Sequence, residues 1–110
     1  MNKQIISKGK NAVYVQDHIG LKTLYNDINR NDYQINISDL FLKLFYHACQ
    51  HERKSTIIFL LRIYFELFSQ CEQIALRQCF FYGKYKLKKK SMISWYSQYV
   101  IPLIKIDFIN

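Results

Sequence analysis

The sequence of 110 residues contains little glycine or proline, with three residues of the first and one of the second. Both residue types punctuate loops, so their scarcity favours long regular elements. Gly9, Gly20 and Gly83 also stand far apart, and no glycine-rich loop that could cradle a phosphate is present. A nucleotide-binding enzyme built on such a loop is therefore excluded.

Cysteine is scarce too, and its odd number is a poor basis for a disulfide framework. Cys49, Cys71 and Cys79 stand among apolar residues, which predicts reduced thiols inside a core. The first 15 residues lack the apolar run of about 7 to 15 residues that a secretory signal needs. We therefore expect an intracellular protein, cytoplasmic or nuclear, in which the sequon at Asn36 is not glycosylated.

Groups that would support catalysis are also few. The eight acidic residues are scattered, with no pair spaced as in a glycosidase or a metal site. His47 and His51 share a helix face, which suits a metal, but no third ligand is predicted. Ala48 stands where a zinc protease has glutamate, and the sequence brings no histidine to Cys79. We expect no enzyme, no cofactor and no metal site.

Apolar and aromatic residues, by contrast, are abundant: 50% of the residues are hydrophobic and 16% are aromatic. A disordered chain carries far less of both. A length of 110 residues suits one domain, and we expect residues 1–110 to form a single helical domain. The chain is also rich in Ile, Lys, Asn and Tyr, as proteins of A/T-rich genomes are, which makes a viral accessory protein one interpretation.

Apolar residues recur with helical spacing along most of the chain. The expected helices span residues 20–29, 38–50, 53–68, 70–82 and 91–100. Ser38 precedes one apolar stripe and is expected to be its N-cap. Gly83 follows another stripe and is expected to end it in the left-handed conformation. The predicted fold class is mainly α, a compact bundle of four to five helices.

Residues 56–68 are apolar almost all round, which predicts a helix at the centre of the bundle. These 13 residues are too few for a membrane span, which needs roughly 20, so we expect no transmembrane segment. Arg62 and Glu66 share the polar face and are expected to pair. The side chains expected to be buried are those of Ile57, Phe59, Leu61, Phe65 and Phe68.

The two ends of the chain have a different pattern. Residues 4–16 alternate apolar and polar around Gly9, which predicts a short hairpin. Residues 103–109 alternate as well and are expected to form an edge strand beside it. The bundle is thus expected to carry a small sheet formed by the N-terminal hairpin and the C-terminal segment.

Lysines are concentrated near the C-terminal end. The net charge is +8, and residues 84–110, with six basic side chains and one acidic, carry +5 of it. The candidate site residues are Lys84, Lys86, Lys88, Lys89 and Lys90. They suit a solvated or protein-contacting surface, the phosphates of a nucleic acid, or an anionic membrane surface. Of the neighbouring aromatic residues, we expect Tyr85, Trp95 and Tyr96 in the core.

These observations favour a non-enzymatic protein–protein interaction module, a small helical adaptor or accessory protein whose partner is another protein or a second copy. The alternative is a small basic nucleic-acid-binding protein that uses the lysines of residues 84–90. No known nucleic-acid-binding signature supports that alternative, and arginine, which forks onto phosphates and bases, is rarer than lysine. Peripheral membrane contact ranks last, because lysines without a second anchor bind lipid reversibly.

Overall fold

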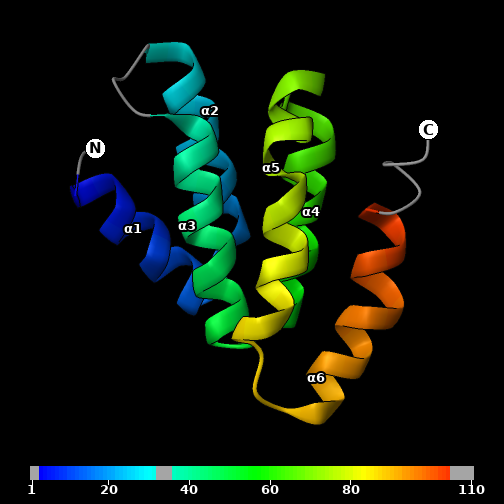
Figure 1. Ribbon diagram of the computed structural model, residues 1–110. Helices are drawn as coiled ribbons and strands as arrows, with labels where there is room; N and C mark the ends of the chain where they lie inside the picture. Colours follow the sequence, from blue (N-terminus) through cyan, green and yellow to red (C-terminus); the bar gives the residue numbers. More distant parts are fainter. Residues whose placement is uncertain (1–2, 32–35, 105–110) are drawn as a thin grey trace.

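The computed structural model describes residues 3–31 and 36–104, and all regular structure within these ranges is helical (Figure 1). The α-helices are α1 (Lys3–Tyr14), α2 (His18–Asn31), α3 (Ile37–Gln50), α4 (Lys54–Leu67), α5 (Gln70–Gly83) and α6 (Lys90–Trp95). A 3-10 helix, Lys84–Lys86, follows α5. Helix α6 runs on through a π-helix, Tyr96–Val100, to residue 104. The predicted mainly α fold is confirmed, with six α-helices in the described part where four to five were expected.

Helix α3 lies at the centre of the described chain, where it packs against α1, α4 and α5 (Figure 1). Its buried residues are Leu40, Phe41, Leu44, Phe45, Ala48 and Cys49. The radius of gyration of 13.4 Å is close to the about 13 Å expected of a compact domain of this length. The prediction that residues 56–68 form the central helix is wrong, because α3 occupies that position and α4 keeps Ile58 and Phe65 partly exposed.

Aromatic rings join the central helices. The ring of Phe80 in α5 lies 4.8 Å from that of Phe45 in α3 and 4.7 Å from that of Tyr64 in α4, edge to face in both cases. Phe41 and Phe68 pack in the same way at 5.0 Å. Each such pair contributes about 0.5 to 1.5 kcal/mol beyond the area it buries, so this cluster fixes how α3, α4 and α5 sit together.

The burial predicted for residues 56–68 is confirmed in part. Ile57, Leu61 and Phe68 are buried, as expected. Phe59 is half-buried, and Phe65 is 40% exposed, so its predicted burial is wrong. Phe65 reaches solvent because it lines an open groove between α4 and residues 95–103.

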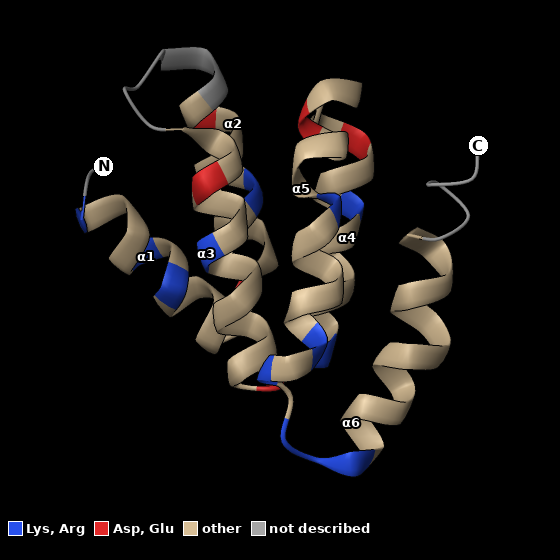
Figure 2. Ribbon diagram, viewed as in Figure 1, with Lys and Arg blue, Asp and Glu red and all other residues tan. Residues whose placement is uncertain are grey.

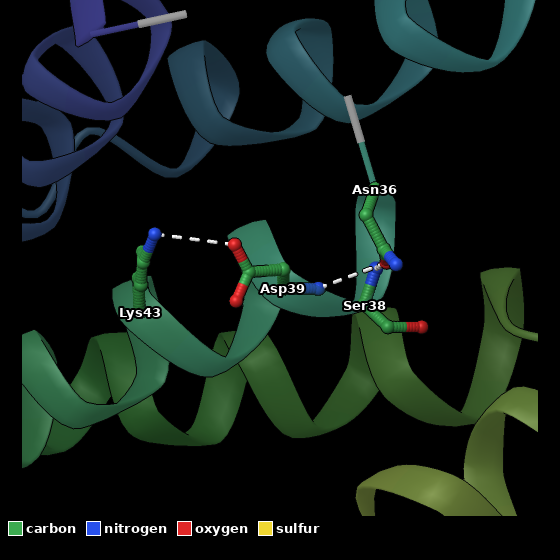
Figure 3. A network of polar contacts seen from close by, with 4 residues as sticks. All are labelled: Asn36, Ser38, Asp39 and Lys43. Carbon is green, nitrogen blue, oxygen red and sulfur yellow. Dashed lines mark hydrogen bonds and ion pairs between the residues drawn. The ribbon is translucent and has the colours of Figure 1, made fainter. Parts of the chain in front are cut away.

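Helix α3 begins one residue earlier than predicted and is capped by Asn36 (Figure 3). The side-chain oxygen of Asn36 accepts hydrogen bonds from the backbone N–H groups of Ser38, at 2.9 Å, and Asp39, at 3.1 Å. Asp39 also pairs with Lys43 at 3.1 Å, one turn further along. The prediction of Ser38 as the N-cap is wrong, because Ser38 lies inside the first turn, where its own N–H needs a partner.

Helix α5 begins at a capping box formed by Ser69 and Glu72 and ends at Gly83. The predicted left-handed conformation of Gly83 is wrong: its φ is −57°, and the chain continues as the 3-10 helix. A Cβ at Gly83 would lie 2.8 Å from Cε2 of Phe45 and 2.9 Å from the hydroxyl of Tyr96. Glycine is needed here because α5 meets α3 and the π-helix too closely for any side chain.

The described part of the chain contains no strand, so the predicted small sheet is wrong. Residues 3–14 form α1 instead of a hairpin, because Ile5, Gly9 and Val13 recur every fourth position and face the bundle. Gly9 obscures this stripe in the sequence, although a Cβ there would lie 2.9 Å from a side chain of α3. The predicted edge strand, 103–109, begins as helix and continues beyond the described residues.

The longest α-helices of the described part, α2 to α5, have 14 residues each. A helix needs about 20 apolar residues to cross the hydrocarbon of a bilayer. Within residues 3–31 and 36–104, no helix therefore combines the length and the apolar character of a membrane span.

Candidate functional site

An apolar groove runs between α4 and the C-terminal helical segment, which we define as residues 90–104. These two walls stand side by side in Figure 1, and the groove has a volume of about 630 Å³. It is lined by Ile58, Leu61, Arg62, Phe65, Glu66, Trp95, Gln98, Tyr99, Val100, Pro102 and Leu103. Apolar and aromatic side chains dominate this set, so the groove is suited to apolar ligands.

Both walls present large side chains to solvent. On α4, Ile58, Leu61 and Phe65 recur at i, i+3 and i+7 and share one face. Leu61 is buried, while Ile58 and Phe65 stay 39% and 40% exposed. On the opposite wall, Tyr99 and Leu103 are 62% and 48% exposed. The apolar surface is therefore continuous across the groove and not covered by the rest of the described chain.

The π-helix, Tyr96–Val100, forms the middle of the second wall. The π-helix packs this wall against the bundle, because its residues Tyr96 and Val100 are buried. The hydroxyl of Tyr96 also donates a hydrogen bond to the backbone oxygen of Phe80 in α5. π-Helices are rare and occur frequently at functional sites. Here the π-helix anchors one side of the wall while Tyr99 faces the groove.

Arg62 and Glu66 are the charged side chains that line the groove. They stand four residues apart on α4, where pairing was predicted. Among the described side chains an ion pair joins Asp39 to Lys43, and none joins Arg62 to Glu66. The groove thus has one positive and one negative charge along its α4 edge.

The basic segment, which we define as residues 84–90, connects α5 to α6 at one end of the bundle (Figure 2). Leu87 is buried and anchors it. The backbone N–H groups of Lys88 and Lys89 donate hydrogen bonds to Oε2 of Glu52, at 3.3 and 3.0 Å. The segment is thus held by its backbone, which leaves its side chains free to extend into solvent.

Four of the five candidate lysines are exposed, and Lys84 is half-buried. The exposed ones are Lys86, Lys88, Lys89 and Lys90. The Nζ atom of Lys86 lies 5.4 Å from the centre of the Tyr46 ring, a cation–π contact that leaves the ammonium group at the surface. The structure therefore brings four of the candidate lysines to one exposed segment.

The neighbouring aromatic residues differ in their exposure. The predicted core position is confirmed for Tyr96, which is fully buried, and Trp95 is half-buried. It is wrong for Tyr85, which lies in the 3-10 helix and is 82% exposed, whereas Leu87, just after this helix, is buried instead. Tyr85 is thus an exposed ring among exposed lysines.

The basic segment lies at one end of the groove. Helices α4 and α6 begin at the same end of the bundle (Figure 1), and the basic segment lies there too (Figure 2). Lys54, the first residue of α4, places its Nζ atom 5.0 Å from the ring of Trp95, which lines the groove. The groove therefore has an electropositive end.

His47 and His51, the candidate metal pair, have ring centroids 4.4 Å apart. Burial, together with the nearby His51 and Lys10, holds the pKa of His47 below its usual value. Residues 3–31 and 36–104 contain no group of three histidine, cysteine, aspartate or glutamate side chains that could hold a metal ion. The two histidine rings thus pack edge to face at the end of α3.

Cys49 and Cys79 are buried, as predicted, whereas Cys71 is exposed and the prediction for it is wrong. Burial raises the pKa of the Cys79 thiol to about 12 and raises that of Cys49 as well. The thiolate is the nucleophilic form of cysteine, so these two thiols are poorly suited to attack a substrate at neutral pH.

The groove is the feature that sequence reasoning missed. Its signal is the apolar character of residues 56–68 on both faces, a pattern that equally predicts a central helix. Leu60 and Tyr64 face the core, whereas Ile58 and Phe65 face the groove. Comparisons with protein-family models, with curated proteins and with solved structures find no significant match to the chain, so the groove and the basic segment are interpreted from their geometry alone.

Proposed function

We propose that the chain is a non-enzymatic protein–protein interaction module that binds a helix of another protein in its groove. The observation that carries the proposal is the row of exposed apolar side chains on both walls: Ile58, Phe65, Tyr99 and Leu103. Covering apolar surface releases roughly 25 cal/mol per Å², so a ligand that fills the groove is favoured by the hydrophobic effect.

The dimensions of the groove suit a helix. Its α4 wall extends from Ile58 to Phe65, two helical turns, or about 10 Å at 1.5 Å per residue. Helices that bind in grooves do so through apolar side chains at i, i+3 or i+4, and i+7, which also span two turns. Such a ligand would place one anchor side chain against each turn of the wall.

A substitution in the groove tests this proposal. Phe65→Gln removes an exposed ring from one wall, and Ile74→Gln makes a similar change on α5, where Ile74 is 56% exposed outside the groove. We expect the tagged wild-type chain, expressed in its native cells, to co-purify with a protein partner. Recovery of this partner should fall at least about tenfold with Phe65→Gln, because an aromatic anchor that is buried in the complex is lost. Ile74→Gln should leave recovery unchanged.

Circular dichroism melting of each variant checks that the fold is intact, and Leu103→Gln on the opposite wall serves if Phe65→Gln unfolds. Equal recovery with the groove and control variants would contradict the proposal. Recovery of no partner by the wild-type chain would contradict it too.

A second candidate function is single-stranded nucleic-acid binding by the basic segment. The observation that favours it is the exposure of Tyr85 beside the exposed lysines. Lysine ammonium groups neutralise phosphates, and an exposed aromatic ring can stack on a base, which contributes about 1 to 3 kcal/mol. Phosphate and base contacts could therefore come from the same short segment.

A salt titration tests this second candidate. If four lysines each neutralise a phosphate of a single-stranded RNA oligonucleotide, the slope of log K against log salt is about −3. Tyr85→Ala should weaken binding by at least about fivefold at every salt concentration. A slope near zero, or no binding at low salt, rules this function out.

A further inference from the structure

The end of the groove at which α4 and α6 begin is positively charged. The nearby acidic residue, Glu52, is already hydrogen-bonded to the protein itself. Lys54 lies over Trp95 at this end, and the exposed lysines of the basic segment lead directly into α6. Glu52 accepts the backbone hydrogen bonds of the basic segment. Glu52 keeps its single negative charge, and the ammonium groups of Lys54, Lys88, Lys89 and Lys90 outnumber it.

The start of α4 adds to this imbalance. Helices α3 and α5 begin with a side-chain cap and an acidic residue in the first turn, as the helix dipole favours. Helix α4 begins with Arg53 and Lys54, without a side-chain cap and without an acidic residue in its first turn. The guanidinium of Arg53 lies 4.4 Å from the centre of the Tyr14 ring in α1, so Lys54 is the cation of this helix start that lies beside Trp95 and the groove. An acidic ligand at Lys54 would also be favoured by the helix dipole.

The two surfaces together restrict what can bind. A nucleic acid would neutralise the lysines but leave the apolar walls uncovered. An uncharged apolar helix would cover the walls but leave the lysines without counter-charges. A helix with an apolar face and acidic residues at one end satisfies both.

We infer that the helix bound in the groove is amphipathic and acidic, with its carboxylates placed against Lys54 and the basic segment. The inference rests on the proposed function and adds the chemistry of the partner. A second copy is disfavoured as occupant, because each chain carries a net charge of +8 and like charges repel at an interface.

Two synthetic peptides of about 15 residues, a length at which isolated helices are marginal in water, test the inference. Both carry leucines at i, i+3, i+4 and i+7, and they differ only in having glutamates or lysines at the remaining end positions. Trp95 is the only tryptophan of the chain and lines the groove, so its fluorescence reports binding directly. A third peptide, acidic but with scrambled leucine positions, separates groove binding from charge alone.

We expect the acidic peptide to bind at least about tenfold more tightly than the basic one at about 50 mM salt, and the ratio to shrink as salt rises. Phe65→Gln should weaken binding of the acidic peptide, and the scrambled peptide should not bind. A fourfold variant, K54Q/K88Q/K89Q/K90Q, should abolish the preference for the acidic peptide.

The matched control is K3Q/K8Q/K10Q/K22Q, which removes the same charge from exposed lysines of α1 and α2 (Figure 2), and it should keep the preference. Equal affinity of the two peptides, both sensitive to Phe65→Gln, overturns the inference and leaves the proposed function standing. Absence of binding by either peptide overturns it as well, and the native-partner experiment then decides the function.

Two further outcomes overturn the inference in favour of other occupants. One is a concentration-dependent dimer in sedimentation velocity that Phe65→Gln dissociates, which would assign the groove to a second copy. The other is single-stranded RNA that displaces the acidic peptide yet binds Phe65→Gln as tightly as wild type, which would assign the basic segment to nucleic acid.

Discussion

At the scale of single residues, the hydroxyl of Tyr25 is the least expected feature of the core. Tyr25 is fully buried against Phe68, and its hydroxyl has no hydrogen-bond partner in the described structure. Burial raises the pKa of Tyr25, so the group stays protonated as a donor without an acceptor. An unsatisfied buried hydroxyl costs about 1 to 3 kcal/mol.

Removing this hydroxyl should therefore not harm the fold. We expect Tyr25→Phe to leave the free energy of unfolding unchanged or to raise it by about 1 kcal/mol, measured by urea denaturation. Tyr64→Phe is the control, because the hydroxyl of Tyr64 donates to the backbone oxygen of Gln73 at 2.8 Å. That variant should lower the free energy by about 1 kcal/mol. A loss of that size in Tyr25→Phe instead would mean that its hydroxyl does have a partner.

At the scale of elements, two polar residues at the start of α3, Asn36 and Ser38, have different roles. Asn36 caps the helix with its side chain, whereas Ser38 contributes its backbone N–H. We expect Asn36→Ala to lower the free energy of unfolding by about 1 kcal/mol and Ser38→Ala to change it by less than about 0.5 kcal/mol. Thermal or urea denaturation of the two variants in parallel measures the difference. A larger loss of stability in Ser38→Ala than in Asn36→Ala would show that Ser38 is the N-cap instead.

Much of the element structure could be predicted from the sequence, for a physical reason. Helices α3, α4 and α5 have dense apolar stripes, and their predicted bounds, 38–50, 53–68 and 70–82, lie within one residue of the observed ones. Helix α1 was missed because one position of its stripe is Gly9, which packs tightly without contributing hydrophobicity. The role of Gly83 could not be predicted for a different reason, because it is set by close contacts with Phe45 and Tyr96, which are distant in sequence.

The basic segment could be located from the sequence, but the groove could not. The lysines of residues 84–90 stand together in the chain, and their exposure follows from their charge. The groove depends on where the C-terminal helical segment packs relative to α4, which the apolar pattern of neither helix specifies. An apolar residue such as Phe65 looks the same in sequence whether it faces a core or a groove.

At the scale of the whole molecule, the helices differ in how firmly they are held. Helix α3 is surrounded by α1, α4 and α5, whereas the C-terminal helical segment stands at the edge of the bundle beyond the groove (Figure 1). Local opening costs least where few buried contacts hold an element. The wall of the groove is therefore expected to open more readily than the centre of the bundle.

Hydrogen–deuterium exchange with mass spectrometry tests this order. We expect peptides covering residues 93–104 to exchange at least about tenfold faster than those covering residues 40–49, because tenfold in exchange corresponds to about 1.4 kcal/mol of opening free energy. A ligand that fills the groove should slow exchange in residues 93–104 first. Equal protection of the two regions would show instead that the bundle opens as one unit.

The contact of Glu52 with the backbone of Lys88 and Lys89 affects how the side chains of this surface can change during evolution. Glu52 itself has a left-handed φ of 54°, a conformation that glycine adopts more easily, so its carboxylate gives a reason for glutamate to be retained there. Because the segment is tied through main-chain N–H groups, residues 88 and 89 can be exchanged without redirecting the chain. The molecule can thus acquire a new electrostatic preference by point substitution, with its architecture kept constant.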